Sequence, residues 1–236
     1  NIQKDGTYSV VPRMWGGVTT PAELRAIADA AEKYGVPMVK VTGGQRIDLL
    51  GVRKEDLPHM WADLNAAGMV SGAAYSKGLR TVKTCVGSEF CRFGTQNSTQ
   101  LGIDLEHDLF NMWSPHKVKL AVSGCPRNCA ESGIKDVGII GVDSGWELYI
   151  GGNGGIKTEA GEFFVKVKSA EEVMEYSLAF LQLYREEAFY LERTVHYLQR
   201  VGMDHIKQAV LNDAERRKAL HQRLLFSLSF EQDPWQ

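Results

Sequence analysis

The sequence has no long hydrophobic run, few cysteines and no excess of charge of either sign. Its purely apolar runs fall far short of the roughly 20 residues that a membrane-spanning helix needs, so no such helix is expected here. Four cysteines in 236 residues are too few for a scaffold held together by disulfides. Lys and Arg number 27 against 29 Asp and Glu, a formal net charge of −2, which excludes an overall basic field that would recruit nucleic acid.

Hydrophobic residues make up 44% and charged residues 24% of the chain, the balance of an ordinary globular protein rather than of a disordered, collagen-like or coiled-coil one. The length allows one large domain or two small ones. We therefore expect a globular protein whose partners include neither nucleic acid nor a membrane. The first residue is Asn1 rather than Met, so we expect a processed chain or part of a longer one.

Local signals in the first third of the chain predict strands alternating with helices. Thr20 followed by Pro21 marks the start of a helix, with Thr20 as its N-cap. Hydrophobic periodicity predicts a second helix over 54–67 and strands over 7–14, 36–42, 46–51 and 78–83. The strand over 78–83 would complete a β-α-β-β-α-β unit of ferredoxin-like type.

The rest of the chain divides into a mixed α/β part and a helical part. The pattern predicts a helix over 95–107, a loop over 125–132 that runs into a helix, and strands over 117–122, 136–142 and 146–150. From residue 170 onward it predicts two or three helices to about residue 225, broken near Gly202. The predicted fold class is α+β, with three parts over 1–83, 84–168 and 169–236.

The four cysteines form two close pairs. Five residues separate Cys85 from Cys91 and three separate Cys125 from Cys129. A structural zinc site usually has shorter spacing within each pair, and disulfides would be odd in a chain that otherwise lacks secreted character. A [4Fe–4S] cluster needs four thiolates and accepts wider spacing. The spacing favours the cluster and leaves zinc, disulfides or unconnected buried cysteines as alternatives.

The segments around the cysteines carry a family resemblance. TCVGSEFC (84–91) and SGCPRNC (123–129) resemble the cluster motif of the sirohaem nitrite and sulfite reductases, C-x₅-C followed after a gap by C-x₃-C. Further blocks resemble the sirohaem part of the large subunits of NADH-dependent assimilatory nitrite reductases, namely 9–20, 41–52, 79–99, 116–141 and 179–194. The likeness covers essentially the whole chain. It implies a ferredoxin-like unit, a sirohaem and [4Fe–4S] binding α/β domain, and a C-terminal helical segment.

The resemblance also implies a function. The four thiolates would hold the cluster, and Cys129 would also bridge to the sirohaem iron. The implied activity is the six-electron reduction of nitrite to ammonia in the cytoplasm, as a step of nitrate assimilation. Two alternatives stay open: a small assimilatory-type sulfite reductase with the same cofactors, and an iron–sulfur electron-transfer or zinc-binding module without haem.

The resemblance implies partners as well. No G-x-G-x-x-G motif follows a predicted strand, so we expect an external electron donor, of the flavin/NADH type or a ferredoxin. Many relatives contain two fused sirohaem-type halves, whereas this sequence has one. We therefore expect a second copy in a homodimer, or a further stretch of chain, to complete the pocket.

An anionic substrate and the eight carboxylates of sirohaem require cations. Lys117 and Lys119 alternate on a predicted strand and so face the same side, although such a pair alone is more often a solvated face of a sheet. The resemblance matches this pair and Arg80, with Arg13 as a second arginine, to the residues around the bound anion. For sirohaem it points to Gln45, Arg46, Arg127, Asn128 and Asn153; GGNGG (151–155) alone would be typical of a hairpin connection.

Overall fold

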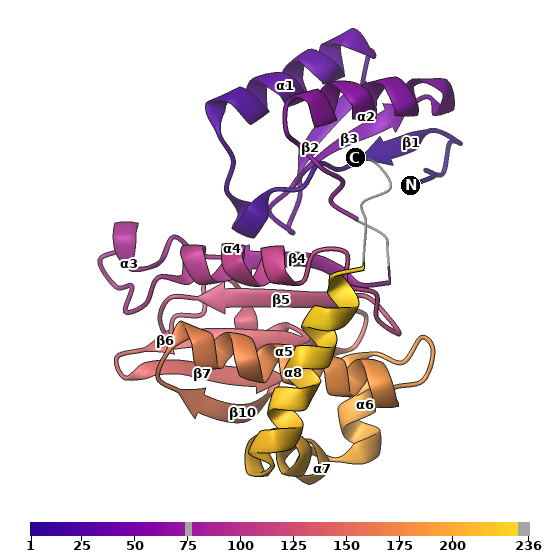
Figure 1. The fold of residues 1–236 in the computed structure, drawn as a ribbon. Coiled ribbons are helices and arrows are strands. Elements are labelled where there is room, and N and C mark those ends of the chain that lie inside the picture. The colour runs from indigo at the N-terminus through magenta and orange to yellow at the C-terminus, as the bar shows by residue number, and fades with distance from the viewer. Residues whose placement is uncertain (74–76, 231–236) are drawn as a thin grey trace.

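The computed structural model describes residues 1–73 and 77–230, which form two units with separate hydrophobic cores (Figure 1). The first unit is a three-stranded antiparallel sheet of order β1-β3-β2, against which two helices pack. Its elements are β1 (Tyr8–Val10), α1 (Pro21–Lys33), β2 (Met38–Val41), β3 (Ile47–Val52) and α2 (Leu57–Ala66), with 3₁₀ turns η1 (Trp15–Gly17) and η2 (Lys54–Asp56).

The first helix begins where the sequence predicts. The Thr20 hydroxyl accepts a hydrogen bond from the Glu23 backbone N–H at 3.2 Å, and the Glu23 carboxylate accepts one from the Thr20 N–H at 2.8 Å. This reciprocal capping box satisfies two of the donors that a helix start leaves unpaired. The second helix begins slightly later than predicted, because residues Lys54–Asp56 form a 3₁₀ turn.

The strand predicted over 78–83 forms, but it belongs to the other sheet. β4 (Leu79–Thr84) pairs in parallel with β5 (Val118–Ser123), because Leu79 and Val82 bury their side chains in the larger core. The prediction that this strand completes the first unit is therefore wrong. In the first unit, the segment after β1 instead forms an isolated antiparallel bridge between Pro12 and Ser71.

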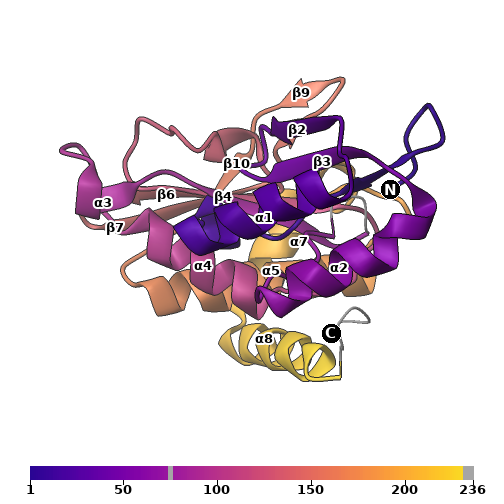
Figure 2. The ribbon, with the colours of Figure 1, turned by 90° about the horizontal axis from the view of Figure 1, so that it is seen from above.

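The second unit is built on a five-stranded sheet of order β10-β7-β6-β5-β4. β4, β5 and β6 (Val137–Val142) are parallel, while β7 (Gly145–Ile150) and β10 (Glu162–Val167) add antiparallel strands. Helices α4 (Ser98–Asp108) and α5 (Ala170–Glu187) cover one face (Figure 2). β10 was not predicted from the sequence.

The alternation of β5 decides what lies on each face of this sheet. Val118, Leu120 and Val122 are fully buried in the core beneath α4 and α5. Successive strand residues point to opposite faces, so Lys119 faces away from that core, toward the first unit. The sheet thus has one apolar face and one face that carries charge.

The C-terminal part is helical, as predicted, and changes direction at Gly202, whose φ is +82°. After α5 it contains α6 (Thr194–Val201), α7 (Met203–Lys207), a π-helical turn (Gln208–Asn212) and α8 (Ala214–Leu228). Leu220 and Leu224 of α8 join the larger core. Arg185 of α5 also donates to Ser227 Oγ at 2.8 Å.

Two connections differ from the prediction. The loop over 125–132 leads into a single 3₁₀ turn, η3 (Ser132–Ile134), rather than a helix. A four-residue helix, α3 (Gly87–Phe90), lies between the first two cysteines. GGNGG contains β8 (Asn153–Gly154), which pairs with β9 (Thr158–Glu159), the hairpin that glycines at these positions favour.

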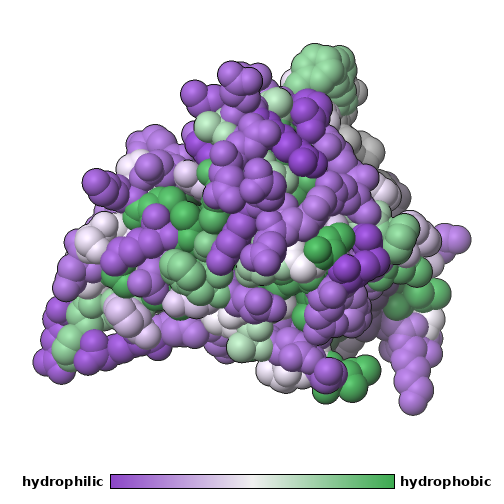
Figure 3. Space-filling view, turned by 90° about the horizontal axis from the view of Figure 1, so that it is seen from below, coloured by the Kyte–Doolittle hydropathy of each residue, from purple (hydrophilic) through white to green (hydrophobic). Residues whose placement is uncertain are grey.

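Within the described residues, no helix combines the length and the apolar character that crossing a membrane requires. The face shown in Figure 3 is mainly hydrophilic, with scattered hydrophobic groups.

Candidate functional site

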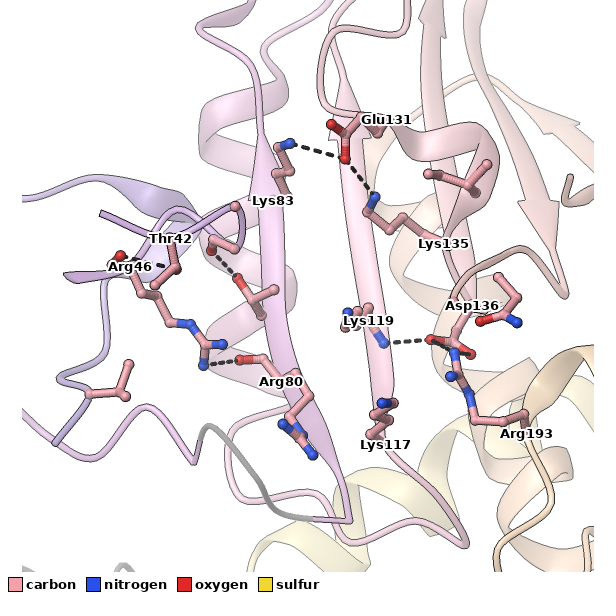
Figure 4. Close-up of a pocket in the computed structure, with 18 of the residues that line it drawn as sticks. Thr42, Arg46, Arg80, Lys83, Lys117, Lys119, Glu131, Lys135, Asp136 and Arg193 are labelled. Carbon is pink, nitrogen blue, oxygen red and sulfur yellow. Dashed lines mark hydrogen bonds and ion pairs between the residues drawn. The ribbon is translucent and has the colours of Figure 1, made fainter. Parts of the chain in front are cut away.

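A cavity of about 510 Å³ opens between the two units, and its lining is strongly cationic (Figure 4). Seven cationic side chains and three carboxylates line it: Arg46, Arg80, Lys83, Lys117, Lys119, Lys135 and Arg193, with Asp48, Glu131 and Asp136. This excess of positive charge suits a ligand with several negative charges.

Lys117 and Lys119 both line this cavity, where Lys117 is half-buried and Lys119 is exposed. Burial lowers the pKa of Lys119, and the positive charges of Lys117 and Arg193 lower it further. The pKa of Lys117 is lowered for the same reasons, by burial first and then by Arg193 and Arg80. Each ammonium group therefore releases a proton at lower pH than a free lysine, which suits a proton donor beside an anion.

Arg46 and Arg80 lie where the two units meet. Arg46, just before β3, donates from Nη1 to the carbonyl oxygens of Gly72 and Arg80, both at 3.0 Å. These bonds tie the turn before β3 to β4. Both arginines line the cavity.

Glu131 connects two cationic residues that the sequence prediction missed. Its Oε2 lies 3.1 Å from Nζ of both Lys83 and Lys135, and the hydrogen bonds from these lysines lower its pKa. Glu131 adopts a left-handed backbone conformation, with φ of +60°. Lys83 lies three residues after Arg80 on β4, whose pairing with β5 is irregular between Leu79 and Thr81, so strand alternation from Arg80 would not have identified it.

Asp136 and Arg193 are further cavity residues that the sequence prediction missed. Asp136 accepts hydrogen bonds from the Lys119 backbone N–H at 2.8 Å and from Arg193 Nη2 at 3.0 and 3.2 Å. Arg193 lies just before α6, far along the chain from β5. No local sequence signal links it to the lysine pair.

The four cysteines gather on loops at one edge of the larger sheet. Cys85 follows β4 and Cys125 follows β5, and the carboxyl ends of neighbouring parallel strands meet at the same edge. The Gly124 N–H donates to Cys85 Sγ at 3.1 Å. The two loops pack so closely that a Cβ on Gly124 would lie 3.0 Å from Gly87 Cα and 2.8 Å from the Gln96 carbonyl oxygen.

The four thiols differ in how far they are buried. All four are free; Cys125 is buried, Cys85 and Cys91 are half-buried, and Cys129 is exposed. In the part of the chain that the structure describes, no three His, Cys, Asp or Glu side chains converge on one metal position. A four-iron cluster accepts more widely spaced thiolates, and backbone N–H groups that point at sulfur, as Gly124 does, are typical of such sites.

Arg13 lies apart from the cavity lining. Its guanidinium is 1% exposed and forms a 2.5 Å ion pair with Glu106 of α4, which is fully buried. Glu106 Oε2 also accepts from the Gly16 N–H at 2.8 Å. Burial raises the pKa of Glu106, and Arg13 opposes that rise. This arginine joins the two units.

Three predicted sirohaem-binding residues also lie outside the cavity lining. Gln45 Oε1 accepts a hydrogen bond from the Thr84 N–H at 2.8 Å, and Gln45 Nε2 donates one to the Thr84 carbonyl oxygen at 2.7 Å. Asn128 shapes the second cysteine loop, where its Oδ1 accepts from the Gly133 N–H at 3.3 Å. Arg127 is exposed and stacks 3.7 Å from the ring centre of Phe93.

Asn153, by contrast, lines the cavity. Its Nδ2 donates to the Lys157 carbonyl oxygen at 3.0 Å. Its side-chain oxygen therefore remains the group available to a ligand's donor, while the neighbouring Gly154 and Gly155 complete this wall.

Two family descriptions match the chain. Residues 1–67 match the "Nitrite/Sulfite reductase ferredoxin-like half domain", and residues 75–218 match the "Nitrite and sulphite reductase 4Fe-4S domain". These limits agree with the assignment of β4 to the second unit.

The curated proteins that this chain resembles include nitrite reductases and a sulfite reductase. The chain is 63% identical over its whole length to "Nitrite reductase [NAD(P)H]" of Bacillus subtilis (strain 168), but spans only 29% of that protein. It is 36% identical to "Sulfite reductase, assimilatory-type" of Nitratidesulfovibrio vulgaris, with 89% of this chain and 95% of that protein covered. Among solved structures, dissimilatory sulfite reductase I matches with a TM-score of 0.77 at 16% identity, over 85% of this chain and 68% of the other.

Proposed function

The chain belongs to the nitrite and sulphite reductase family, and we propose that it is the catalytic part of an assimilatory nitrite reductase, which reduces nitrite to ammonia. One observation carries this proposal. The strands β4 and β5 that line the cationic cavity also lead into the loops that hold Cys85 and Cys125. An anion site and an electron-carrying site are thereby built on the same two strands.

The family binds a [4Fe–4S] cluster and sirohaem, and the residues present fit both. Cys85, Cys91, Cys125 and Cys129 would hold the cluster. The cationic lining would bind the carboxylates of sirohaem, with Arg46, Lys83 and Lys135 as the candidates away from the lysine pair. When bound, the two cofactors supply single electrons and an iron to which the substrate anion binds.

The remaining chemistry falls to the protein. We assign Arg80, Lys117 and Lys119 to hold the oxygen atoms of nitrite and to compensate its charge. The two lysines, whose pKa values are lowered, would deliver protons to those oxygens as the nitrogen–oxygen bonds break. Arg13 is left out of this set, because its charge is already compensated by Glu106.

Sulfite reduction is the second candidate. It is favoured by the relative named as an assimilatory-type sulfite reductase, which has nearly the length of this chain. Nitrite is preferred because of the much higher identity to the nitrite reductase of Bacillus subtilis. Steady-state kcat/KM values for nitrite and for sulfite, measured with one artificial electron donor, decide between them.

The electron donor follows from the same relative. Since the chain spans 29% of a protein named for NAD(P)H, we propose that a NAD(P)H-linked module delivers the electrons; a homodimer would complete the pocket. We also propose a cytoplasmic location, because the cytosol keeps thiols reduced and so available to bind a cluster.

The first test is the absorption spectrum of the purified protein together with iron and acid-labile sulfide analysis. A chlorin-type haem band with about five irons per chain supports the proposal. Iron without a haem band would leave an electron carrier, and zinc or no metal in the protein from iron-supplied cells would overturn it.

A further inference from the structure

Asp136 connects three parts of the chain beneath the cavity. Its carboxylate is 1% exposed and accepts from the Lys119 N–H on β5 and from Arg193 Nη2 before α6. The Thr194 hydroxyl also donates to it, and the Asp136 N–H donates to the Lys119 carbonyl oxygen at 3.0 Å. The C-terminal helical segment is thereby fixed to the strand that carries the lysine pair.

Arg193 has donor capacity that Asp136 does not use. Its side chain is 14% exposed and lines the cavity. Only Nη2 reaches Asp136, and Nε is buried with no hydrogen-bond partner among the described residues. A guanidinium group offers five N–H donors in a planar fork that matches a carboxylate or another oxyanion. A buried donor without a partner is costly unless a ligand supplies the acceptor.

The neighbours of Arg193 are also cationic. Its charge is among the causes that lower the pKa of both Lys117 and Lys119, so it lies close enough to the pair to act on it. Three cations that repel one another are brought together here, with Asp136 as the counter-charge. Such an arrangement is suited to an anion that would relieve the repulsion.

We propose that Arg193 is an additional anion-binding residue of the cavity and that Asp136 positions it. The ligand group is an anionic oxygen, from a sirohaem carboxylate or from the substrate. The proposal rests on the proposed function, which supplies both anions. It assigns to the C-terminal helical segment a direct part in the site, beyond covering the sheet.

The test uses the protein purified with its cofactors and the variants Arg193→Gln, Asp136→Asn and Arg200→Gln. Arg200 is the matched control, since it is an exposed arginine of α6 paired with Glu192. Two quantities are measured besides turnover: sirohaem per cluster with its rate of loss to an acceptor protein, and the Kd of nitrite from optical titration. Removing a charge-assisted hydrogen bond should change one of them by about tenfold or more.

The two anion sources give different results. Faster sirohaem loss with an unchanged nitrite Kd assigns Arg193 to a carboxylate of sirohaem; a weaker nitrite Kd at full sirohaem content assigns it to the substrate. Asp136→Asn should reproduce the effect, and the double variant should add little to either single one, because the two residues act as one unit. If Asp136→Asn does not fold, Arg193→Gln alone decides.

Values for Arg193→Gln that match those of Arg200→Gln in both measurements would overturn the inference. Wild-type protein that takes up no sirohaem would instead overturn the proposed function, so the two failures are distinguishable.

Discussion

Replacing Glu106 with Gln is expected to remove a large part of the stability of this protein. The Arg13–Glu106 pair spans 2.5 Å between side chains that are 1% and 0% exposed, and it joins the loop after β1 to α4 of the other unit. Removing one partner of a buried pair leaves an uncompensated charge, which costs about 3–5 kcal/mol. In a Gln side chain one of the two oxygens is also replaced by an NH2 donor, which would face either Arg13 Nη1 or the Gly16 N–H, both of them donors.

Urea unfolding followed by tryptophan fluorescence measures this change. With a slope of about 2–3 kcal/mol per molar urea, the midpoint should fall by roughly 1–2.5 M. The control is Glu32→Gln, because Glu32 is an exposed residue of α1; it should change the free energy of unfolding by less than about 0.5 kcal/mol. A loss below about 1 kcal/mol for Glu106→Gln would refute the reasoning and would free Arg13 for another role.

Three further predictions concern the site. Lys119→Met should lower kcat for nitrite about 10²- to 10³-fold while the haem spectrum persists; loss of the spectrum would make Lys119 a sirohaem-binding residue instead. In the cofactor-free chain the same variant should raise the free energy of unfolding at neutral pH, because folding lowers the pKa of Lys119 by burial. The gain in stability of the variant over the wild type should shrink as the pH rises from the lowered pKa of Lys119 in the folded chain toward 10.5, its value in the unfolded chain. If urea titrations give the same gain at every pH, this reasoning is contradicted. Gln45→Ala removes both hydrogen bonds to Thr84 and should lower the free energy of unfolding by about 1–3 kcal/mol. Because Cys85 directly follows Thr84, the variant should also lose the visible absorbance of the cluster faster than the wild type. An unchanged rate of loss would mean that Gln45 stabilises only the backbone around Thr84.

The sequence allowed the prediction of features whose cause is local. The start of α1 follows from Thr20 and its neighbours, and the shared face of Lys117 and Lys119 follows from strand alternation. The sheet to which β4 belongs could not be predicted, because the pairing partner of a strand is set by contacts distant in sequence. Arg193 was missed for the same reason: it lies near the lysine pair because the helical segment packs there, where Asp136 binds both Arg193 and the Lys119 N–H.

The parallel pairing of β4 and β5 explains why so short a stretch of sequence contains both kinds of site residue. A strand rises about 3.3 Å per residue, so Lys119 and Cys125 are separated by roughly 20 Å along β5 and the loop after it. Arg80 and Cys85 are separated by roughly 16 Å along β4 by the same rise. Because the two strands run in the same direction, both cysteines come to one end while the cations lie along the strands.

The salt bridges of Glu131 connect the cysteine end of the sheet to the cations of the cavity. Glu131 follows the second cysteine loop directly and binds Lys83 on β4 and Lys135 before β6. Glu131 thereby places the residues after the second cysteine loop in contact with two cations of the cavity. An antiparallel β4–β5 pair would have sent the two cysteine loops to opposite ends of the sheet, where no single cluster could bind both. The parallel pairing is therefore the feature of the fold on which the joint site depends.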